Sequence, residues 1–122
     1  MKDIRERSDI ERMVNDFYGK VRKDPDLGYI FDEVARLDWD AHLPRMYAFW
    51  SSILLGEHGY SGNPMRVHLI LNQKVPLSEK AFSSWIRLFN ETVDTLFSGE
   101  KAEEAKMRAE SIAGIMKARI GS

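Results

Sequence analysis

The chain contains no cysteine among its 122 residues. This absence excludes disulfide bonds, zinc–thiolate sites, iron–sulfur clusters and a cysteine nucleophile. A length of 122 residues allows one domain and leaves no room for a second. We therefore expect a single domain over residues 1–122 that is stabilised by a hydrophobic core and not by covalent links.

An excess of charge of one sign is also lacking. The chain has 18 Lys and Arg against 19 Asp and Glu, a net charge of −1, whereas a nucleic-acid binder usually carries a basic excess. The longest stretch without a charged residue, Met46 to Gly56, is far shorter than a membrane span, and residues 1–15 are too charged for a signal peptide. We expect a soluble, cytoplasmic protein with no nucleic-acid or membrane partner.

Only four prolines and eight glycines interrupt an apolar pattern that is helical throughout. In the first long segment, apolar residues recur every three or four positions from Ile10 to Val21, which is the spacing of one helix face. Ser8 and Glu11 have the spacing of a capping box at its start, and Pro25 disfavours helix at the residue before it. Since no useful stretch alternates in the manner of a strand, the predicted fold class is all-α.

The same periodicity predicts four substantial helices and two shorter ones. Pro44 is expected in the first turn of the second long helix, where proline is tolerated, and Gly56 and Gly99 are natural helix stops. The long helices are expected at about residues 8–24, 38 or 40 to 55, 78–98 and 100–119, and the short ones within 25–35 and 64–71.

The three histidines are the first candidates for chemistry. His58 lies in a glycine-rich loop, where a solvated side chain is the simplest interpretation. His42 and His68 each lie on the apolar face of a predicted helix, where either a core histidine bonded to a backbone carbonyl or a shared functional site is possible. Their spacing matches no zinc motif such as H-x-x-x-H or H-E-x-x-H, and the chain contains no nucleophile elbow, Walker loop or dinucleotide fingerprint.

The remaining signal is an apolar surface rich in aromatic side chains and methionine, built from three Trp, four Tyr, six Phe and six Met. A flat apolar cofactor suits this surface better than hydrolysis does. Globin-type haem is held by one neutral imidazole and requires no cysteine. Tyr18 and Trp85 would add hydrogen-bond donors from the inner faces of two helices. The same surface would also suit a haem-free helical module that binds a small apolar ligand or a partner helix.

Several motifs then stand together along the chain. F-W-S-S-I-L-L-G at residues 49–56 is followed by G-N-P-M-R-V-H-L at 62–69. With the stretches 16–31, 38–56, 60–69, 82–89 and 108–113, the sequence resembles the group III truncated haemoglobins of bacteria. The resemblance touches nearly the whole chain and implies a truncated globin fold, with helices packed around a haem pocket and haem b as the cofactor.

The resemblance also implies roles for individual residues. His68 matches the proximal ligand to the haem iron and is thus the expected metal-binding residue. Tyr18 and Trp85 match the distal donors to the bound ligand, and His42 matches the histidine that gates the pocket. Three further residues are expected at the haem, namely Phe31 at its edge, Met46 facing the distal cavity and Arg45 near a propionate.

Two positions depart from the family pattern. Tyr29 stands where many relatives carry proline, which changes the short loop before Phe31 but removes no ligand. Ala81 stands where many relatives carry histidine. His68 is the better candidate for the iron ligand because the N-P-M-x-x-H-L context matches as a block, and we expect Ala81 at the helix surface, where the change is nearly neutral.

The resulting hypothesis is a haem protein that binds O2, NO, CO or peroxide at an iron held by His68. Strong donation by Tyr18 and Trp85 would slow O2 release. Slow release suits nitric oxide detoxification by a dioxygenase reaction, or peroxidase-like chemistry, as well as it suits storage and better than oxygen transport. The sequence does not choose between a carrier and an enzyme. We expect a monomer that would draw electrons from an external reductase.

Overall fold

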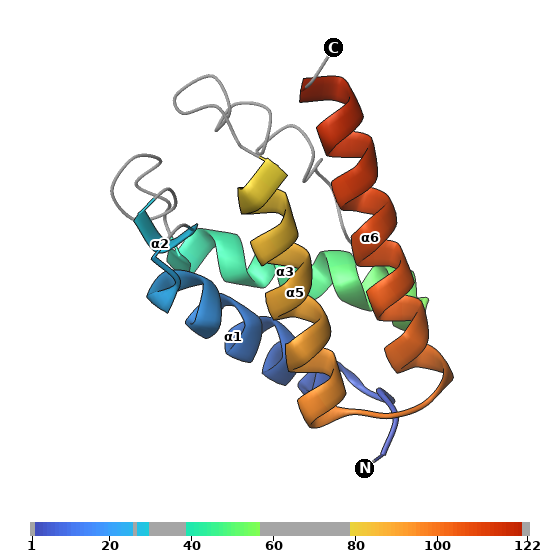
Figure 1. Ribbon diagram of the computed structural model, residues 1–122. Helices are drawn as coiled ribbons and strands as arrows, with labels where there is room; N and C mark the ends of the chain where they lie inside the picture. The colour runs from blue at the N-terminus through green and yellow to red at the C-terminus, as the bar shows by residue number, and fades with distance from the viewer. Residues whose placement is uncertain (1, 26, 30–38, 57–78, 121–122) are drawn as a thin grey trace.

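The computed structural model describes residues 2–25, 27–29, 39–56 and 79–120. Every regular element in these ranges is a helix (Figure 1). The predicted all-α class is confirmed, whereas the helix expected within 64–71 lies outside the described residues. The helices are α1 (Arg7–Lys23), α2 (Leu27–Tyr29), α3 (Trp39–Leu55), α5 (Glu79–Leu96) and α6 (Glu100–Ile120).

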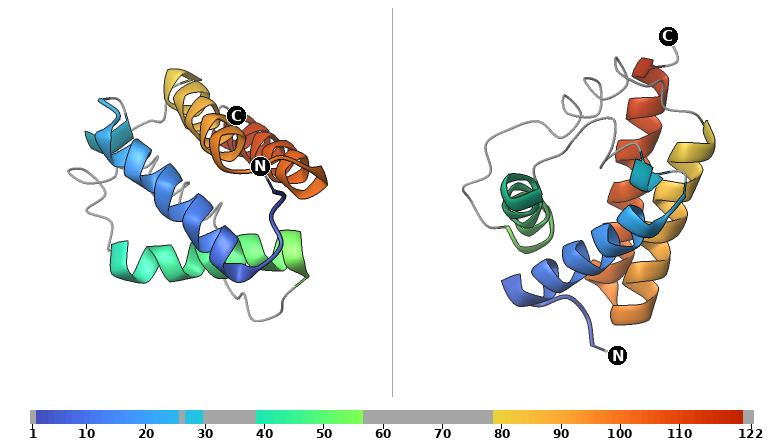
Figure 2. Two further views of the ribbon diagram at one scale, coloured as in Figure 1. Left: turned by 90° about the horizontal axis from the view of Figure 1, so that it is seen from below. Right: turned by 90° about the vertical axis from the view of Figure 1, so that its left-hand side faces the viewer.

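The four long helices form two pairs, α1 with α3 and α5 with α6. Helix α1 also packs on α5, and α3 packs on α6, so that the two pairs close on one core. Figure 2 shows α5 and α6 side by side, with α1 packed against both α3 and α5. The short helix α2 contacts both α1 and α5.

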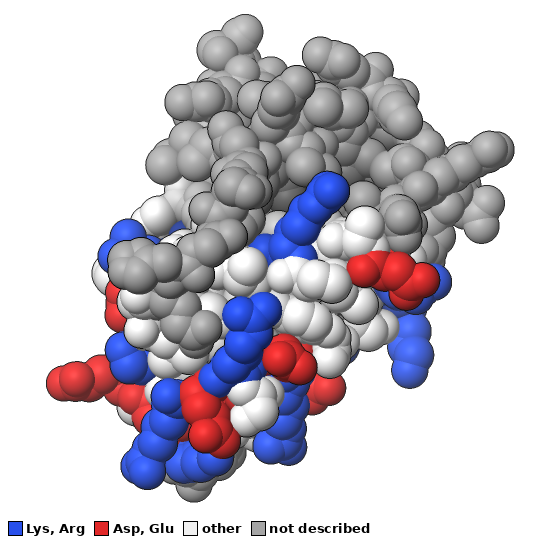
Figure 3. All heavy atoms as spheres, turned by 180° about the vertical axis from the view of Figure 1, so that it is seen from behind, with Lys and Arg blue, Asp and Glu red and all other residues white. Residues whose placement is uncertain are grey.

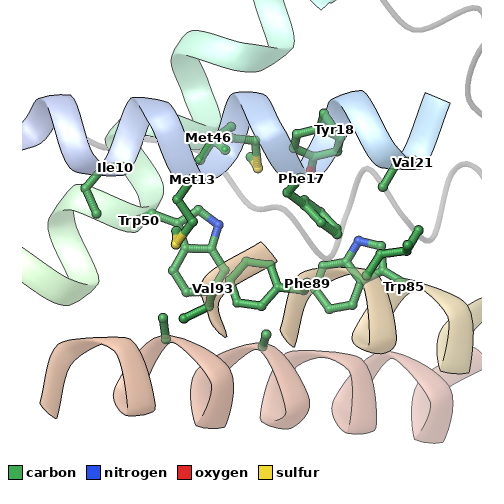
Figure 4. Close-up of a cluster of buried hydrophobic side chains, with 14 of the residues drawn as sticks. Ile10, Met13, Phe17, Tyr18, Val21, Met46, Trp50, Trp85, Phe89 and Val93 are labelled. Carbon is green, nitrogen blue, oxygen red and sulfur yellow. The ribbon is translucent and has the colours of Figure 1, made fainter. Parts of the chain in front are cut away.

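The core lies where the apolar faces of these helices meet. Phe89 of α5 is at its centre, where its ring stacks on Trp50 of α3 at 5.0 Å and on Trp85 at 6.1 Å (Figure 4). Stacked rings stabilise a core beyond the area that they bury. The apolar face predicted for the first helix is buried in full, and it consists of Ile10, Met13, Val14, Phe17, Tyr18 and Val21.

The start of α1 differs from the prediction. Its capping box joins Glu6 and Asp9, and not Ser8 and Glu11. Asp9 is only 5% exposed, and its carboxylate accepts hydrogen bonds from two upstream backbone N–H groups at 3.0 and 3.2 Å. A buried carboxylate must be satisfied in this way, so the burial of Asp9 places the cap two residues earlier than the sequence pattern suggests.

Helix α1 ends where the sequence predicts. Asp24 is extended, with φ −72° and ψ 130°, and Pro25 follows it. The chain then turns back so closely that the N–H of Gly28 donates to the carbonyl of Asp24 at 2.8 Å. A Cβ at Gly28 would collide with the carbonyl oxygen of Arg22, so only glycine allows this close approach of the backbone.

Helix α3 contains Pro44 as its sixth residue, so the proline lies in the second turn. The prediction had placed it in the first turn. Its ring removes the N–H that would otherwise bond to the carbonyl of Asp40. The side chain is exposed, and the helix continues past it to Leu55. Gly56 then takes φ +70°, the left-handed conformation that commonly ends a helix at glycine.

The N-terminal segment ties α6 to the rest of the fold. The Asp3 carboxylate accepts hydrogen bonds from the backbone N–H groups of Lys101 and Ala102, both at 2.9 Å, and thereby caps α6. The Lys101 Nζ donates in turn to the carbonyl of Leu54 at 2.6 Å, in the last turn of α3. We call residues 2–9, with the carboxylates of Asp3 and Asp9, the N-terminal clasp.

The surface carries both signs of charge. Figure 3 shows Lys and Arg interspersed with Asp and Glu over the described part of one face. Some of these charges form ion pairs, such as Lys106 with Asp94 at 2.7 Å and with Glu103 at 3.1 Å. None of the helices in the described ranges combines the length and the hydropathy needed to cross a membrane.

Candidate functional site

Tyr18 lies at the crossing of α1 and α3. Its ring is 5.1 Å from the ring of His42, at an angle of 82°. Both side chains are buried, with Tyr18 5% and His42 6% exposed. The structure therefore brings together two residues that the sequence singled out on separate helices, and it buries both polar side chains in an aromatic environment.

Trp85 reaches this region from α5. Its ring lies 5.6 Å from the ring of Phe17, which in turn lies 4.9 Å from the ring of Tyr18. Figure 4 shows Phe17 and Tyr18 on α1 above Trp85. The phenol, the imidazole and the indole thus come from three different helices, and Phe17 links the indole to the other two.

Burial further favours the protonated form of Tyr18. Removal of the phenol from water raises its pKa far above the ordinary value of 10.0, because the negatively charged phenolate loses its hydration. The hydroxyl therefore keeps its proton at neutral pH. Tyr18 can act as a hydrogen-bond donor to a ligand, and not as a base.

The other predicted site residues differ in their placement. Met46 is buried and lies in the same core cluster as Tyr18 (Figure 4). Arg45, the next residue of α3, is exposed. Phe31 and His68 lie outside the described residues, as does His58.

Two residues that the sequence did not single out belong to the same cluster. The Trp39 ring lies 5.3 Å from Tyr18 and 5.8 Å from His42, and the guanidinium carbon of Arg22 lies 4.9 Å from the centre of the Trp39 ring. Trp39 precedes His42 by three residues, and Arg22 follows Tyr18 by four, so each shares a helix face with a predicted site residue. That spacing becomes informative once α3 is known to begin at Trp39. We call Tyr18, Arg22, Trp39 and His42 the Tyr18 cluster.

The expectation for Ala81 was wrong. Its side chain is buried, with 5% exposed, and does not lie at the surface of α5. Ala81 precedes Trp85 by four residues and therefore lies on the same inner face. A histidine at this position would have to fit into the core. Tyr29, the other departure, is the last residue of α2.

Comparisons with known proteins identify the family and agree with the helical fold. The family model described as bacterial-like globin matches residues 3–118. The group 3 truncated hemoglobin ctb of Campylobacter jejuni is 36% identical over 107 residues, which cover 85% of this chain and 82% of that protein. The crystal structure of group III truncated hemoglobin from Campylobacter jejuni aligns with a TM-score of 0.84 and 32% identity, over 98% of this chain and 95% of that one.

Proposed function

Because this chain belongs to the bacterial-like globin family, as a group III truncated haemoglobin, we propose that it holds haem b through His68 and binds diatomic ligands beside Tyr18. Membership in the globin family itself brings a haem cofactor and the binding of small gaseous ligands such as O2. The proposal adds the residues and their roles. Tyr18 and Trp85 are the donors, His42 is the gate, and Phe31, Arg45 and Met46 surround the haem.

The described side chains fit a haem by the chemistry of their donors. A porphyrin is flat and apolar except for its propionates, so it needs apolar walls, with hydrogen-bond donors on the side where a ligand binds. Phe17 and Met46 supply buried apolar surface, and Tyr18, His42 and Trp85 are buried beside it. Packing alone does not require hydrogen-bonding groups at these positions. This gathering of three buried donor residues is the observation that carries the proposal.

The haem, when bound, supplies the iron that takes the diatomic ligand. The part of the chain is to orient that ligand. The Tyr18 hydroxyl, whose ionised form burial disfavours, donates a hydrogen bond to it, and the Trp85 indole, which can only donate, adds a second. A hydrogen bond to a charged oxygen contributes about 1.5–3 kcal/mol, which corresponds to roughly one to two decades in the dissociation rate.

Slow release determines which role fits best. A protein that releases O2 slowly is a poor carrier, but it keeps O2 available for reaction with nitric oxide. We therefore favour nitric oxide dioxygenase activity over oxygen transport, with peroxidase-like activity as a further use of the same donors. Action as a monomer in the cytoplasm, with an external reductase, belongs to the same prediction.

Reconstitution with haem tests the proposal. The purified chain, incubated with haemin, should develop a Soret band. His68→Gly should lose the bond between iron and imidazole, and added free imidazole should restore it, whereas the control His58→Gly should match the parent protein. A chain that folds fully and stays colourless would contradict the proposal and would favour the haem-free helical module.

The reaction with nitric oxide tests the proposed activity. The oxygenated protein, mixed with nitric oxide, should form one nitrate for each bound O2 that reacts. Rapid loss of O2 without nitrate formation would contradict dioxygenase activity, while the assignment of haem and ligand binding would stand.

A further inference from the structure

The Tyr18 cluster is ordered from the solvent inwards. Arg22 is exposed, Trp39 is half-buried, and Tyr18 and His42 are buried. The ring of Trp39 lies 5.3 Å from the ring of Tyr18 and 5.8 Å from that of His42. The Arg22 guanidinium lies over the Trp39 ring, 4.9 Å from its centre. Trp39 therefore stands between an exposed cation and the two side chains proposed to meet the ligand.

We propose that Trp39, held by Arg22, is a positioning residue that keeps the ring of His42 against that of Tyr18, as in this structure, and that this contact is the closed state of the gate; this rests on the ligand site proposed above. Trp39 itself acts through these two rings and need not touch the ligand. Arg22 acts one step further out, because its cation–π contact fixes the face that Trp39 presents to them.

The geometry explains why this position is effective. The ring of Trp39 meets both Tyr18 and His42 edge to face, at 62° and 79°, and Tyr18 meets His42 in the same manner at 82°. Three edge-to-face contacts of this kind form a closed triangle. His42 cannot swing away from Tyr18 without losing its contact with Trp39 as well, so the Trp39 ring biases the gate towards the closed state.

The size of each contribution follows from the type of contact. A cation–π contact at an exposed site is weak, so loss of Arg22 should change the population of the open gate by about twofold to fivefold. Loss of the Trp39 ring removes two aromatic contacts at once, and we expect roughly a tenfold change.

The experiment uses the haem-loaded protein with carbon monoxide as the probe. Two quantities are measured, the C–O stretching band by infrared spectroscopy and the CO association rate by flash photolysis. In Trp39→Leu we expect a second C–O band, from molecules with a displaced His42, and about tenfold faster association. Trp39→Phe, which keeps a ring, should retain the parent band. Arg22→Ala should show an intermediate effect, and Arg22→Lys should restore most of the parent behaviour.

A haem-independent measurement tests the link between the two residues. A double-mutant cycle of Arg22→Ala and Trp39→Leu, followed by denaturant unfolding of the haem-free chain, should give a coupling of about twofold to fivefold in the unfolding equilibrium constant. Arg12→Ala is the matched control, because it removes another exposed guanidinium from α1, ten residues earlier, and it should show no coupling with Trp39.

The outcomes separate this inference from the proposed function. If Tyr18→Phe changes ligand kinetics while Trp39→Leu keeps the parent band and rate, the ligand site stands and the positioning role is wrong. Zero coupling in the cycle would refute the role of Arg22. If Trp39→Leu does not fold, Trp39→Phe and Arg22→Ala decide the question, and parent behaviour in Arg22→Ala would then overturn the inference. A parent protein that binds no haem would overturn the proposed function, and this inference with it.

Discussion

The two ends of α1 bury polar groups in opposite ways. At its start, in the N-terminal clasp, Asp3 and Asp9 are surrounded by backbone N–H groups that donate to them. Towards its end, Tyr18 is surrounded by the rings of Phe17, Trp39 and His42. The carboxylates therefore use their hydrogen-bonding capacity within the protein, whereas the Tyr18 side chain is held by contacts between rings.

The difference separates stability from function. A carboxylate that accepts several backbone hydrogen bonds fixes the helix ends it joins, and it offers little to a ligand. A phenol packed edge-on against rings keeps its shape while its hydroxyl stays available as a donor. Substitutions at the clasp should therefore change stability and leave ligand binding unchanged, whereas loss of the Tyr18 hydroxyl should change ligand binding and leave stability nearly unchanged.

Phe89 belongs to the core between the two ends, and its loss should have the largest effect. Phe89→Ala should lower the free energy of unfolding by about 3–5 kcal/mol, because it removes a buried ring that stacks on Trp50 and Trp85. Urea unfolding measures this. The control Met107→Ala, at a side chain that is 58% exposed, should change stability by less than about 0.5 kcal/mol. Similar effects of the two substitutions would contradict the placement of Phe89 at the centre of the core.

Tyr18→Phe should affect function alone. The ring and its aromatic contacts remain, so stability should change little, whereas loss of the donated hydrogen bond should raise the O2 dissociation rate about tenfold to a hundredfold. Stopped-flow displacement of O2 measures the rate. Tyr47→Phe is the matched control, since its hydroxyl bonds to Asn15 at the surface. An unchanged rate in Tyr18→Phe would remove the functional distinction between the two ends.

Asp3→Ala should affect stability alone. It removes the cap of α6, and the free energy of unfolding should fall by about 1–2 kcal/mol. The O2 dissociation rate should match that of the parent protein. Thermal or urea unfolding, together with the same stopped-flow assay, tests both statements, and a changed ligand rate would show that the two ends are coupled.

The clasp should also make stability depend on acid pH. Burial by itself raises the pKa of Asp3 and of Asp9, but the hydrogen bonds from backbone N–H groups outweigh it and hold each pKa below the ordinary value of 3.8. A group with a lowered folded-state pKa contributes stability above its unfolded pKa and loses that contribution as the pH falls through the folded value. Unfolding followed from about pH 5 downwards should show this loss. The double variant Asp3→Asn, Asp9→Asn should have a flatter acid limb, and an equally steep one would exclude the clasp as its source.

Surface ion pairs away from both ends of α1 should contribute least to stability and nothing to ligand binding. Asp94→Asn breaks the pair with Lys106, and the free energy of unfolding should change by less than about 0.5 kcal/mol, because such pairs are screened by water and salt. Ligand binding should be unchanged. A larger loss, or one that persists at high salt, would show that this surface pair acts as part of the structural framework.

Much of the fold could be predicted because helix periodicity is a local property. The face of α1 from Ile10 to Val21 follows from the spacing of its apolar residues, and Pro25 and Gly56 mark helix ends by their own backbone preferences. The start of α1 was predicted less well, because the buried Asp9 forms the capping box with Glu6 in place of the predicted pair Ser8 and Glu11. Spacing does not reveal burial at a helix end.

The candidate site could be predicted in part. The resemblance to a family placed Tyr18, His42 and Trp85 in one group, and the structure brings them into one region on three helices. Trp39 stayed unnoticed because its importance depends on the crossing of α3 over α1. Ala81 was misplaced because alanine carries little hydropathy signal, so that its burial depends on the neighbouring helices and not on its own side chain.

The helical class, the absence of disulfides and the inner faces of the long helices all follow from the sequence, whereas the residues proposed to serve a haem come from the resemblance to a family. Only the tertiary structure decided that Trp39 and Arg22 join Tyr18 and His42, and that Asp3 caps a helix that begins almost one hundred residues later. The physical reason is the same in each case. An apolar period shows which face of a helix must be covered, but the residues that cover it are chosen by how the helices cross.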